Sequence, residues 1–368
     1  MKHGPLMLIC LALALFGAPW VMAAPLSPLL IDLSAFTPNY LGQTSAAGGG
    51  QEESAIMIVR PQPYEVIQRA EGAAEVSVRL AQPAPAACIA QVKCAGEAIV
   101  CERALSPGQS EVVLPGVPEG GWYTLVVSSG GKEVASVPFG VGDVFLVAGQ
   151  SNAGGNGDGF IPDHSGMVSV KAWEQDLWLL ATRRDERMHP EMQPGSAWPI
   201  LGELLATARG VPIGFINVAR GGSNTDQWLP ANNDLYPRLP SALKQYQVSA
   251  ILWHQGESDA ASGWPTEKTR ANMETIIRQS WQDAGWQVPW YVAFVSFIPG
   301  LEQEKMDATR LAQKQLCQEG LAYLGPDTDV YVDPDTMRHD HLHFNGVGLR
   351  VHAILWFMTL TWGAPGSG

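Results

Sequence analysis

The pattern of apolar and polar residues changes near residue 140. Before it, short apolar runs alternate with polar residues between turns, as in Glu75–Leu80, Glu111–Leu114 and Trp122–Val127. Alternation with a period of two is typical of antiparallel strands that bury one face. We therefore predict a small β-sandwich domain over residues 56–140. Its expected role is to pack against a larger domain, and carbohydrate binding is the alternative.

After residue 140 the apolar runs become continuous, as expected for strands buried on both faces of a parallel sheet. They occur at Val144–Ala148, Gly214–Ala219, Ser249–Trp253, Pro289–Phe297 and Asp329–Val332. Helical segments lie between them, such as Ile200–Ala208 and Thr266–Ala284. Strand and helix in alternation predict an α/β domain over residues 141–364, with reactive groups at the carboxyl ends of the strands.

The first 24 residues have the organisation of a secretory signal peptide. Lys2 precedes an apolar run, Leu6–Phe16, and Val21–Ala23 fits the small-residue cleavage rule. The run is shorter than the roughly 20 residues of a membrane span. We predict a signal peptide over 1–24, a secreted or periplasmic location, and no integral membrane segment after cleavage; a buried helix is the alternative. Residues 25–55 include a Gly- and Ser-rich stretch and are predicted to be an N-terminal extension or linker.

Composition narrows the classes of partner. The chain has 23 basic and 36 acidic residues and a formal charge of −13, which disfavours a nucleic-acid partner. A hydrophobic content of 46% with 16% charged residues excludes a disordered polymer. Export would permit disulfides. Cys88, Cys94 and Cys101 lie close together in sequence and either form one local bridge or are ordinary thiols, whereas Cys317 is distant from them in sequence.

Two short polar blocks directly follow predicted strands. In Gly149-Gln150-Ser151-Asn152, Ser151 begins a tight turn into a helix, where backbone N–H groups can hold a developing oxyanion. Taken alone, a Ser at this position is more often a helix N-cap. The second block contains Gly221-Gly222-Ser223, in which glycines let the backbone approach a ligand closely.

Two further blocks carry histidine. In Trp253-His254-Gln255-Gly256-Glu257-Ser258-Asp259, Gln255 could donate an amide N–H, and His254 is interpreted as structural. In Asp340-His341-Leu342-His343, the carboxylate can fold back onto the His343 ring and fix its tautomer. His339, His341 and His343 alternate, which leaves a metal site as an alternative, but the Asp-x-x-His spacing favours His343 as a base.

In their order along the chain, the four blocks resemble those of the SGNH (GDSL-like) hydrolase superfamily. Within it, they are similar to the sialate O-acetylesterase and plant-type acetylxylan esterase branch of carbohydrate esterases. That branch has a GQSN-type block, a GG-S/T block, an HQGESD-type block and a terminal D-x-x-H block, spread here over residues 144 to about 356. The resemblance implies a three-layer, flavodoxin-like parallel sheet.

The resemblance also assigns roles to residues. Ser151 would be the nucleophile, His343 its general base, and Asp340 the residue that orients His343. The oxyanion hole would consist of the Ser151 N–H, the Gly222 N–H and the Gln255 side chain. It implies no metal and no cofactor.

Other residues are expected to support the site or to contact substrate. Glu257 and Asn152 belong to the matching blocks, and the resemblance alone does not settle their roles. Trp228 and Trp264 follow two of the blocks closely and are candidates for stacking on a sugar ring. Ala153 follows the GQSN block, where related proteins commonly have Met, which puts the identity of the substrate in doubt.

The function predicted from the sequence is that of an exported serine esterase. It would remove O-acetyl groups from an oligo- or polysaccharide through an acetyl-enzyme intermediate. Two alternatives stay open: a periplasmic polysaccharide O-acetyltransferase with the same triad, and a catalytically silent carbohydrate-binding protein.

Overall fold

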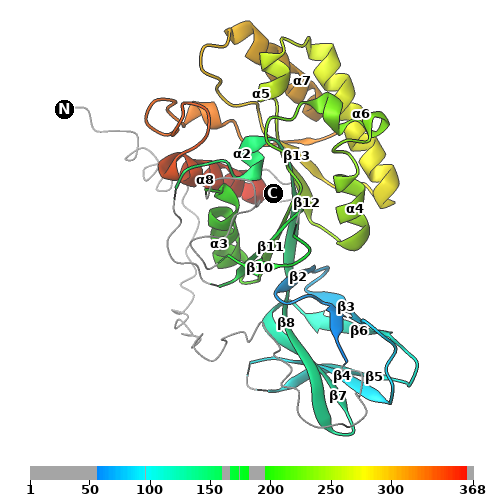
Figure 1. Ribbon diagram of the computed structural model, residues 1–368. Helices are drawn as coiled ribbons and strands as arrows, with labels where there is room; N and C mark the ends of the chain where they lie inside the picture. Colours follow the sequence, from blue (N-terminus) through cyan, green and yellow to red (C-terminus); the bar gives the residue numbers. More distant parts are fainter. Residues whose placement is uncertain (1–55, 96, 160–165, 174, 182–194, 363–368) are drawn as a thin grey trace, which may run out of the picture. The chain divides into compact units, whose positions relative to one another are not determined.

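A computed structural model describes residues 56–95, 97–159, 166–173, 175–181 and 195–362 (Figure 1). The predicted signal peptide over 1–24 and the predicted extension over 25–55 lie outside these residues. Within the described ranges, every helix is too short or too polar to cross a membrane.

Antiparallel strands form the part of the chain before residue 140. Strands β1 (Ile58–Arg60), β3 (Ala73–Leu80) and β6 (Glu111–Pro118) make one sheet. Strand β4 (Cys88–Lys93) pairs with β5 (Ile99–Leu105) on one side and with β7 (Gly120–Ser129) on the other, and β7 pairs with the start of β8. Buried residues from both groups share one hydrophobic core. The predicted antiparallel strands are confirmed, whereas the separate sandwich domain stays a prediction.

Strand β8 (Lys132–Gly149) continues through the predicted domain boundary at residue 140. Its first half pairs antiparallel with β7, and its second half pairs parallel with β11 (Ile213–Asn217) and β12 (Ala250–His254). The short strand β2 (Glu65–Gln68) pairs with it at the crossing point. From Phe139 onward every residue of β8 is buried, which explains why its sequence pattern becomes continuously apolar.

The larger sheet has the strand order β10-β9-β11-β8-β12-β13-β14. Its neighbours are parallel, except that β10 (Leu179–Leu180) is antiparallel to β9 (Val168–Ala172). Without β9 and β10, the strands follow the 2-1-3-4-5 chain order of flavodoxin-like sheets. Strands β13 (Trp290–Val292) and β14 (Tyr323–Leu324) complete the sheet.

One predicted strand is wrong. The apolar run at 329–332 overlaps a 3-10 helix, η4 (Thr328–Val330), and β14 precedes it in the chain. The Asp327 side chain accepts the backbone N–H of Asp329, which stabilises a tight turn in place of an extended conformation.

Helices cover both faces of the sheet, giving the three layers seen in Figure 1. Val144 and Leu146 of β8 point toward α4 (Arg238–Gln245), α6 (Thr266–Ala284) and α7 (Gln303–Gln318). Phe145 and Val147 point toward α3 (Ala197–Arg209) and α8 (Gly346–Trp362). Successive residues of a strand face opposite sides, so one strand serves both cores. The helices predicted around residues 200–208 and 266–284 are confirmed.

The remaining elements are short and mostly follow strands. They are α2 (Ser151–Gly154), η2 (Thr225–Trp228), η3 (Pro230–Asn232) and α5 (Glu257–Ala261). Cys88, Cys94, Cys101 and Cys317 are free thiols in the structure, so the local bridge is absent from it. Burial raises the pKa of the Cys317 thiol to about 11.

Candidate active site

The sequence blocks meet because three parallel neighbours end at the same edge of the sheet. β11, β8 and β12 end at Asn217, Gly149 and His254, and a block follows each. A Cβ added at Gly149 would lie 2.1 Å from the backbone oxygen of His254, in a backbone conformation with φ of 125°. Only glycine fits there, so Gly149 allows the nucleophile block to lie directly against the block that begins with Trp253.

Ser151 is the first residue of the short helix α2, which is held at both ends. At its start, Gln150 Oε1 accepts the backbone N–H groups of Gly256 (3.3 Å) and Ser258 (3.2 Å). At its end, Asn217 Nδ2 donates to the carbonyls of Ala153 and Gly154. An N–H in the first turn of a helix has no intrahelical acceptor, which leaves that of Ser151 free to bind an anion.

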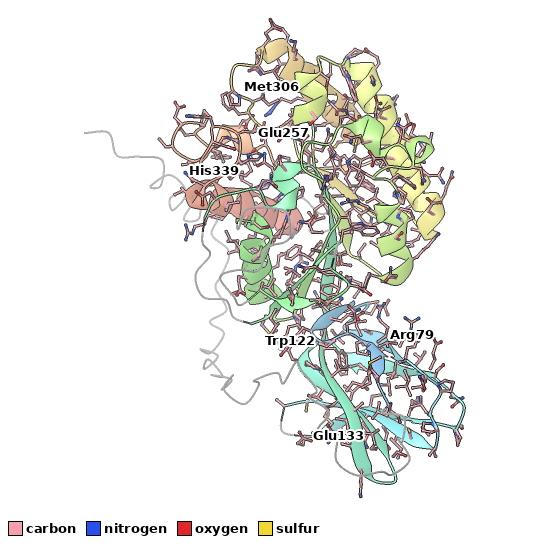
Figure 2. All side chains as sticks on the ribbon, in the orientation of Figure 1. Arg79, Trp122, Glu133, Glu257, Met306 and His339 are labelled. Carbon is pink, nitrogen blue, oxygen red and sulfur yellow. The ribbon has the colours of Figure 1, made fainter. Side chains whose placement is uncertain are left out.

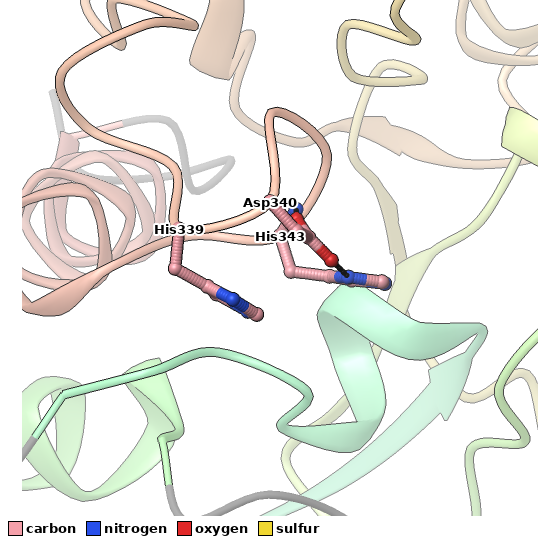
Figure 3. A group of neighbouring side chains, drawn as sticks. All are labelled: His339, Asp340 and His343. Atoms are coloured by element: carbon pink, nitrogen blue, oxygen red, sulfur yellow. Dashed lines mark hydrogen bonds and ion pairs between the residues drawn. The ribbon is translucent and has the colours of Figure 1, made fainter.

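Asp340 and His343 form a direct pair. His343 Nδ1 donates to Asp340 Oδ2 at 2.6 Å, and Asp340 Oδ1 accepts the backbone N–H groups of Leu342 and His343 (Figure 3). Partial burial acts to raise the pKa of Asp340, but the hydrogen bonds from His343 and Leu342 prevail and hold it well below its usual range. Because a carboxylate only accepts, Nδ1 carries the proton, and Nε2 of the neutral ring is left as the base.

The loop that carries this pair is joined to the chain following Ser151. Asp158 N–H donates to the Phe344 carbonyl at 2.9 Å, and His339 Nε2 lies 3.1 Å from the Asn156 carbonyl. Figure 3 shows the His343 ring beside α2. The structure thus brings together the segments that contain Ser151, Asp340 and His343.

The two other predicted oxyanion donors lie after the neighbouring strands. Gly222 has φ of 69°, and no atom lies within 4 Å of a Cβ built there, so the space at its side-chain position is open. Gln255 is buried, and its Nε2 donates to Asp259 Oδ1 at 2.7 Å and lies 3.4 Å from the Ser223 carbonyl. The strong bond orients the amide, while the long contact leaves the second N–H able to turn to a better acceptor.

Asp259 is a residue whose role the sequence analysis missed. Its carboxylate also accepts the backbone N–H of Thr225 (2.9 Å), the Thr225 hydroxyl (2.7 Å) and the Thr269 hydroxyl (3.0 Å). Burial raises the pKa of Asp259 against the effect of these bonds. Asp259 therefore joins Gln255 to the start of η2 and to α6. Its position in the HQGESD-type block was the only available signal, because Thr225 and Thr269 lie outside that block in sequence.

Glu257, the first residue of α5, contacts the segment that contains Ser151 through Asn152. Its Oε1 accepts from Asn152 Nδ2 (3.1 Å) and from the Ser296 hydroxyl (3.0 Å), and its side chain is buried (Figure 2). The buried Arg338 guanidinium lies 3.5 Å from Ser296 Oγ and donates to the Leu342 carbonyl. These contacts form a polar path from Asn152, beside Ser151, to the loop of His343.

His254 is buried in a pair with His352. The Trp356 indole N–H donates to His352 Nε2 at 2.9 Å, so that nitrogen is unprotonated and accepts from His254 Nδ1 at 3.1 Å. Burial lowers the pKa of both rings. His254 is therefore a neutral histidine of the core, as predicted.

The predicted stacking role of Trp228 is wrong. Its side chain is 0% exposed, its ring packs edge-on against Trp253, and its indole N–H donates to Ser223 Oγ at 2.9 Å. Trp228 thus supports the glycine block from the core. Trp264 is partly exposed, with Lys268 Nζ 3.4 Å from its ring centre, and its stacking role stays a prediction.

Comparison with known proteins identifies the family of this chain. Residues 141–353 match the model of the carbohydrate esterase, sialic acid-specific acetylesterase family, and the chain belongs to that family. This membership confirms the resemblance inferred from the four blocks.

Two relatives illustrate the similarity. A probable carbohydrate esterase of Arabidopsis thaliana is 26% identical over 163 residues, which are 37% of this chain and 61% of that protein. The match therefore spans less than two thirds of the relative. The fold is similar to that of a carbohydrate acetylesterase from Xanthomonas citri, with a TM-score of 0.58 and 20% identity over 82% of this chain and 75% of the other.

Proposed function

We propose that this protein is a serine esterase that removes O-acetyl groups from a carbohydrate through a Ser151–His343–Asp340 triad. The observation that carries the proposal is the hydrogen-bonded Asp340–His343 pair on a loop joined to the chain after Ser151. Membership of a carbohydrate esterase family supports the choice of an ester of a sugar hydroxyl.

In the proposed mechanism, His343 Nε2 takes the Ser151 proton while Ser151 Oγ attacks the acetyl carbonyl carbon. The tetrahedral intermediate collapses, the bond to the sugar oxygen breaks, and that oxygen receives the proton from His343. Water then gives a proton to His343 and attacks the acetyl-enzyme, which releases acetate and restores Ser151. Asp340 stabilises the imidazolium in both halves and stays ionised, because its pKa is depressed.

The negative oxygen of each tetrahedral intermediate would be held by the N–H groups of Ser151 and Gly222 and by the Gln255 amide. The open space at Gly222 and the orientation of Gln255 by Asp259 support this assignment. Glu257 would act through Asn152, whose amide it accepts next to the nucleophile.

The organisation of the chain is part of the proposal. We assign residues 1–24 to an export signal, 25–55 to a linker, 56–140 to a small β-sandwich and 141–364 to the catalytic domain. The continuity of β8 supports a rigid junction between the last two.

The test is acetate release from 4-nitrophenyl acetate and from a panel of acetylated polysaccharides. Wild type should release acetate, and S151A should release none beyond the uncatalysed rate. S262A, at an exposed serine just after α5, serves as the matched control and should retain activity. Equal release by wild type and S151A would overturn the proposal. Acetyl transfer to an added acceptor in preference to water would establish the transferase instead.

A further inference from the structure

We propose that His339 and His343 form a binding site for a divalent transition-metal ion, for which Zn²⁺ is the probe, and that the bound ion inhibits the enzyme. The binding claim rests on the geometry of the two rings. The inhibition claim also rests on the proposed function, in which His343 is the base.

The two rings lie on opposite arms of a narrow hairpin. His339 N–H donates to the His343 carbonyl at 2.9 Å, and Arg338 and Phe344 form an antiparallel bridge just outside this pair. The ring centres are 5.9 Å apart and their planes are inclined by 23° (Figure 3). One candidate ligand atom from each of His339, Asp340 and His343 lies within 4.8 Å of the other two.

Each ring has one nitrogen already held by a hydrogen-bond acceptor. His343 Nδ1 donates to the Asp340 carboxylate at 2.6 Å, and His339 Nε2 faces the Asn156 carbonyl at 3.1 Å. A carbonyl oxygen only accepts, so Nε2 of His339 carries the proton. In their neutral forms the rings therefore present lone pairs at His343 Nε2 and His339 Nδ1.

This is the arrangement that metal-binding histidines usually have. Such a histidine donates its other ring N–H to a carboxylate or a backbone carbonyl, which fixes the ring and makes the ligating nitrogen more basic. Asp340 supplies the carboxylate for one ring and Asn156 the carbonyl for the other. Two preoriented imidazoles suit Zn²⁺, Cu²⁺ or Ni²⁺ rather than Mg²⁺ or Ca²⁺.

The two rings lie 5.9 Å apart and nearly parallel, so they must turn toward each other to share one ion, and the contact of His339 with the Asn156 carbonyl must then adjust. Zn–N bonds of about 2.1 Å in a tetrahedral site place two ligand nitrogens about 3.4 Å apart. His339 is exposed, so its ring can rotate by the required amount without repacking the core. Water molecules complete the coordination, and Asp340 keeps its bond to Nδ1 of His343.

Binding at His343 Nε2 would occupy the lone pair that accepts the Ser151 proton. The ion forms a coordinate bond there and exchanges no electrons, so inhibition should be reversed when a chelator removes it. Zn²⁺ would therefore inhibit the esterase by occupying Nε2 of His343, its general base.

The test uses full-length protein in two parallel measurements. The first is calorimetric titration with ZnCl₂ in a buffer that does not chelate the ion. The second is hydrolysis of 4-nitrophenyl acetate against Zn²⁺ concentration, followed by EDTA. The variants are H339N and its control H341N. His341 lies on the same loop, is exposed, and has φ of 63°, a conformation that Asn tolerates.

Wild type and H341N should bind one Zn²⁺ and lose activity reversibly. H339N should show about a tenfold or greater loss of Zn²⁺ affinity, and its inhibition by Zn²⁺, measured relative to its own basal rate, should weaken by the same factor, as expected when a metal site is disrupted. Equal Zn²⁺ binding by H339N and wild type, or no binding by wild type, would overturn the inference. If wild type hydrolyses nothing, the proposed function fails while the calorimetric comparison still decides the metal site.

Discussion

Two sets of polar residues, Asp340 with His343 and Gln255 with Asp259, differ in burial and in the number of their hydrogen-bond partners. The Asp340 side chain is 42% exposed and that of His343 is 16% exposed, and both lie on one short loop. Asp259 is 0% exposed, Gln255 is 1% exposed, and the cited partners of their side chains come from two other segments, residues 223–225 and α6. In the proposed mechanism His343 must gain and lose a positive charge beside the ionised Asp340, whereas the buried set must hold one geometry.

This difference has a physical reason. A group that becomes charged during the reaction is stabilised by nearby water and by a single opposite charge. A donor that waits for an oxyanion is most effective when it is preorganised and shielded from water. The exposed loop therefore suits proton transfer, and the buried network suits stabilisation of the oxyanion. Mutations in the two regions should have different effects on activity and stability.

The largest effect is expected from D340N. Asn leaves the loop geometry nearly intact but favours the wrong His343 tautomer, so kcat should fall about 10⁴-fold, as in other serine triads. The thermal unfolding midpoint should fall modestly, because Asn can still accept the two backbone N–H groups but no longer carries the charge that pairs with His343. Steady-state kinetics and thermal melting measure the two effects. D335N, at an exposed site on the same loop, is the control, and an equal loss there would contradict the assignment.

A smaller loss is expected from Q255A. Removing one oxyanion donor usually costs about 2.7–4 kcal/mol of barrier, which is about 10²–10³ in kcat. KM should stay nearly constant, because the bond strengthens only in the transition state. Q303A changes an exposed glutamine at the start of α7 and should keep full activity. Unchanged kcat in Q255A would remove Gln255 from the oxyanion hole.

D259N should combine a loss of activity with a loss of stability. The Asn amide would face donors of Gln255 and Thr225, leaving buried polar groups unpaired at a cost of about 1–3 kcal/mol in the free energy of unfolding. kcat should fall less than in Q255A, since Gln255 is misplaced but present. Denaturant unfolding and kinetics on D259N and the double variant D259N/Q255A separate the effects. Full additivity in kcat would contradict a positioning role.

W228F should have the smallest effect. It keeps an aromatic ring in the core and removes the hydrogen bond to Ser223, which is worth about 1 kcal/mol of stability. The ratio of activities on acetylated saccharides and on 4-nitrophenyl acetate should not change, because the ring is buried. A selective loss on saccharides would restore the sugar-stacking interpretation.

Local patterns were sufficient to predict much of the fold. The helix at residues 266–284 and the buried strand at 144–148 follow from periodicity over consecutive residues. The run at 329–332 was misread because a side chain bonded to its own backbone there overrides a short apolar pattern. β9 was missed because no continuous apolar run marks it: Lys171 is buried within it and paired with Asp176.

The candidate active site shows the same limit of prediction from local sequence patterns. Asp340 and His343 are three residues apart, so their pairing could be predicted from spacing. Gln255 is four residues from Asp259, but the partners Thr225 and Thr269 are 34 and 10 residues away in sequence, and no local pattern indicates them. Trp228 was placed wrongly because distance along the chain from Gly222 does not determine which side of η2 the ring occupies.

The most direct test of the account is the identity of the acylated residue. Wild type would be mixed rapidly with 4-nitrophenyl acetate, quenched in acid, digested, and analysed by mass spectrometry. The account predicts an acetyl group on Ser151, more of it in D340N if deacylation is slowed more than acylation, and none on that peptide in S151A. An acetyl group on another side chain, with Ser151 unmodified during turnover, would contradict it.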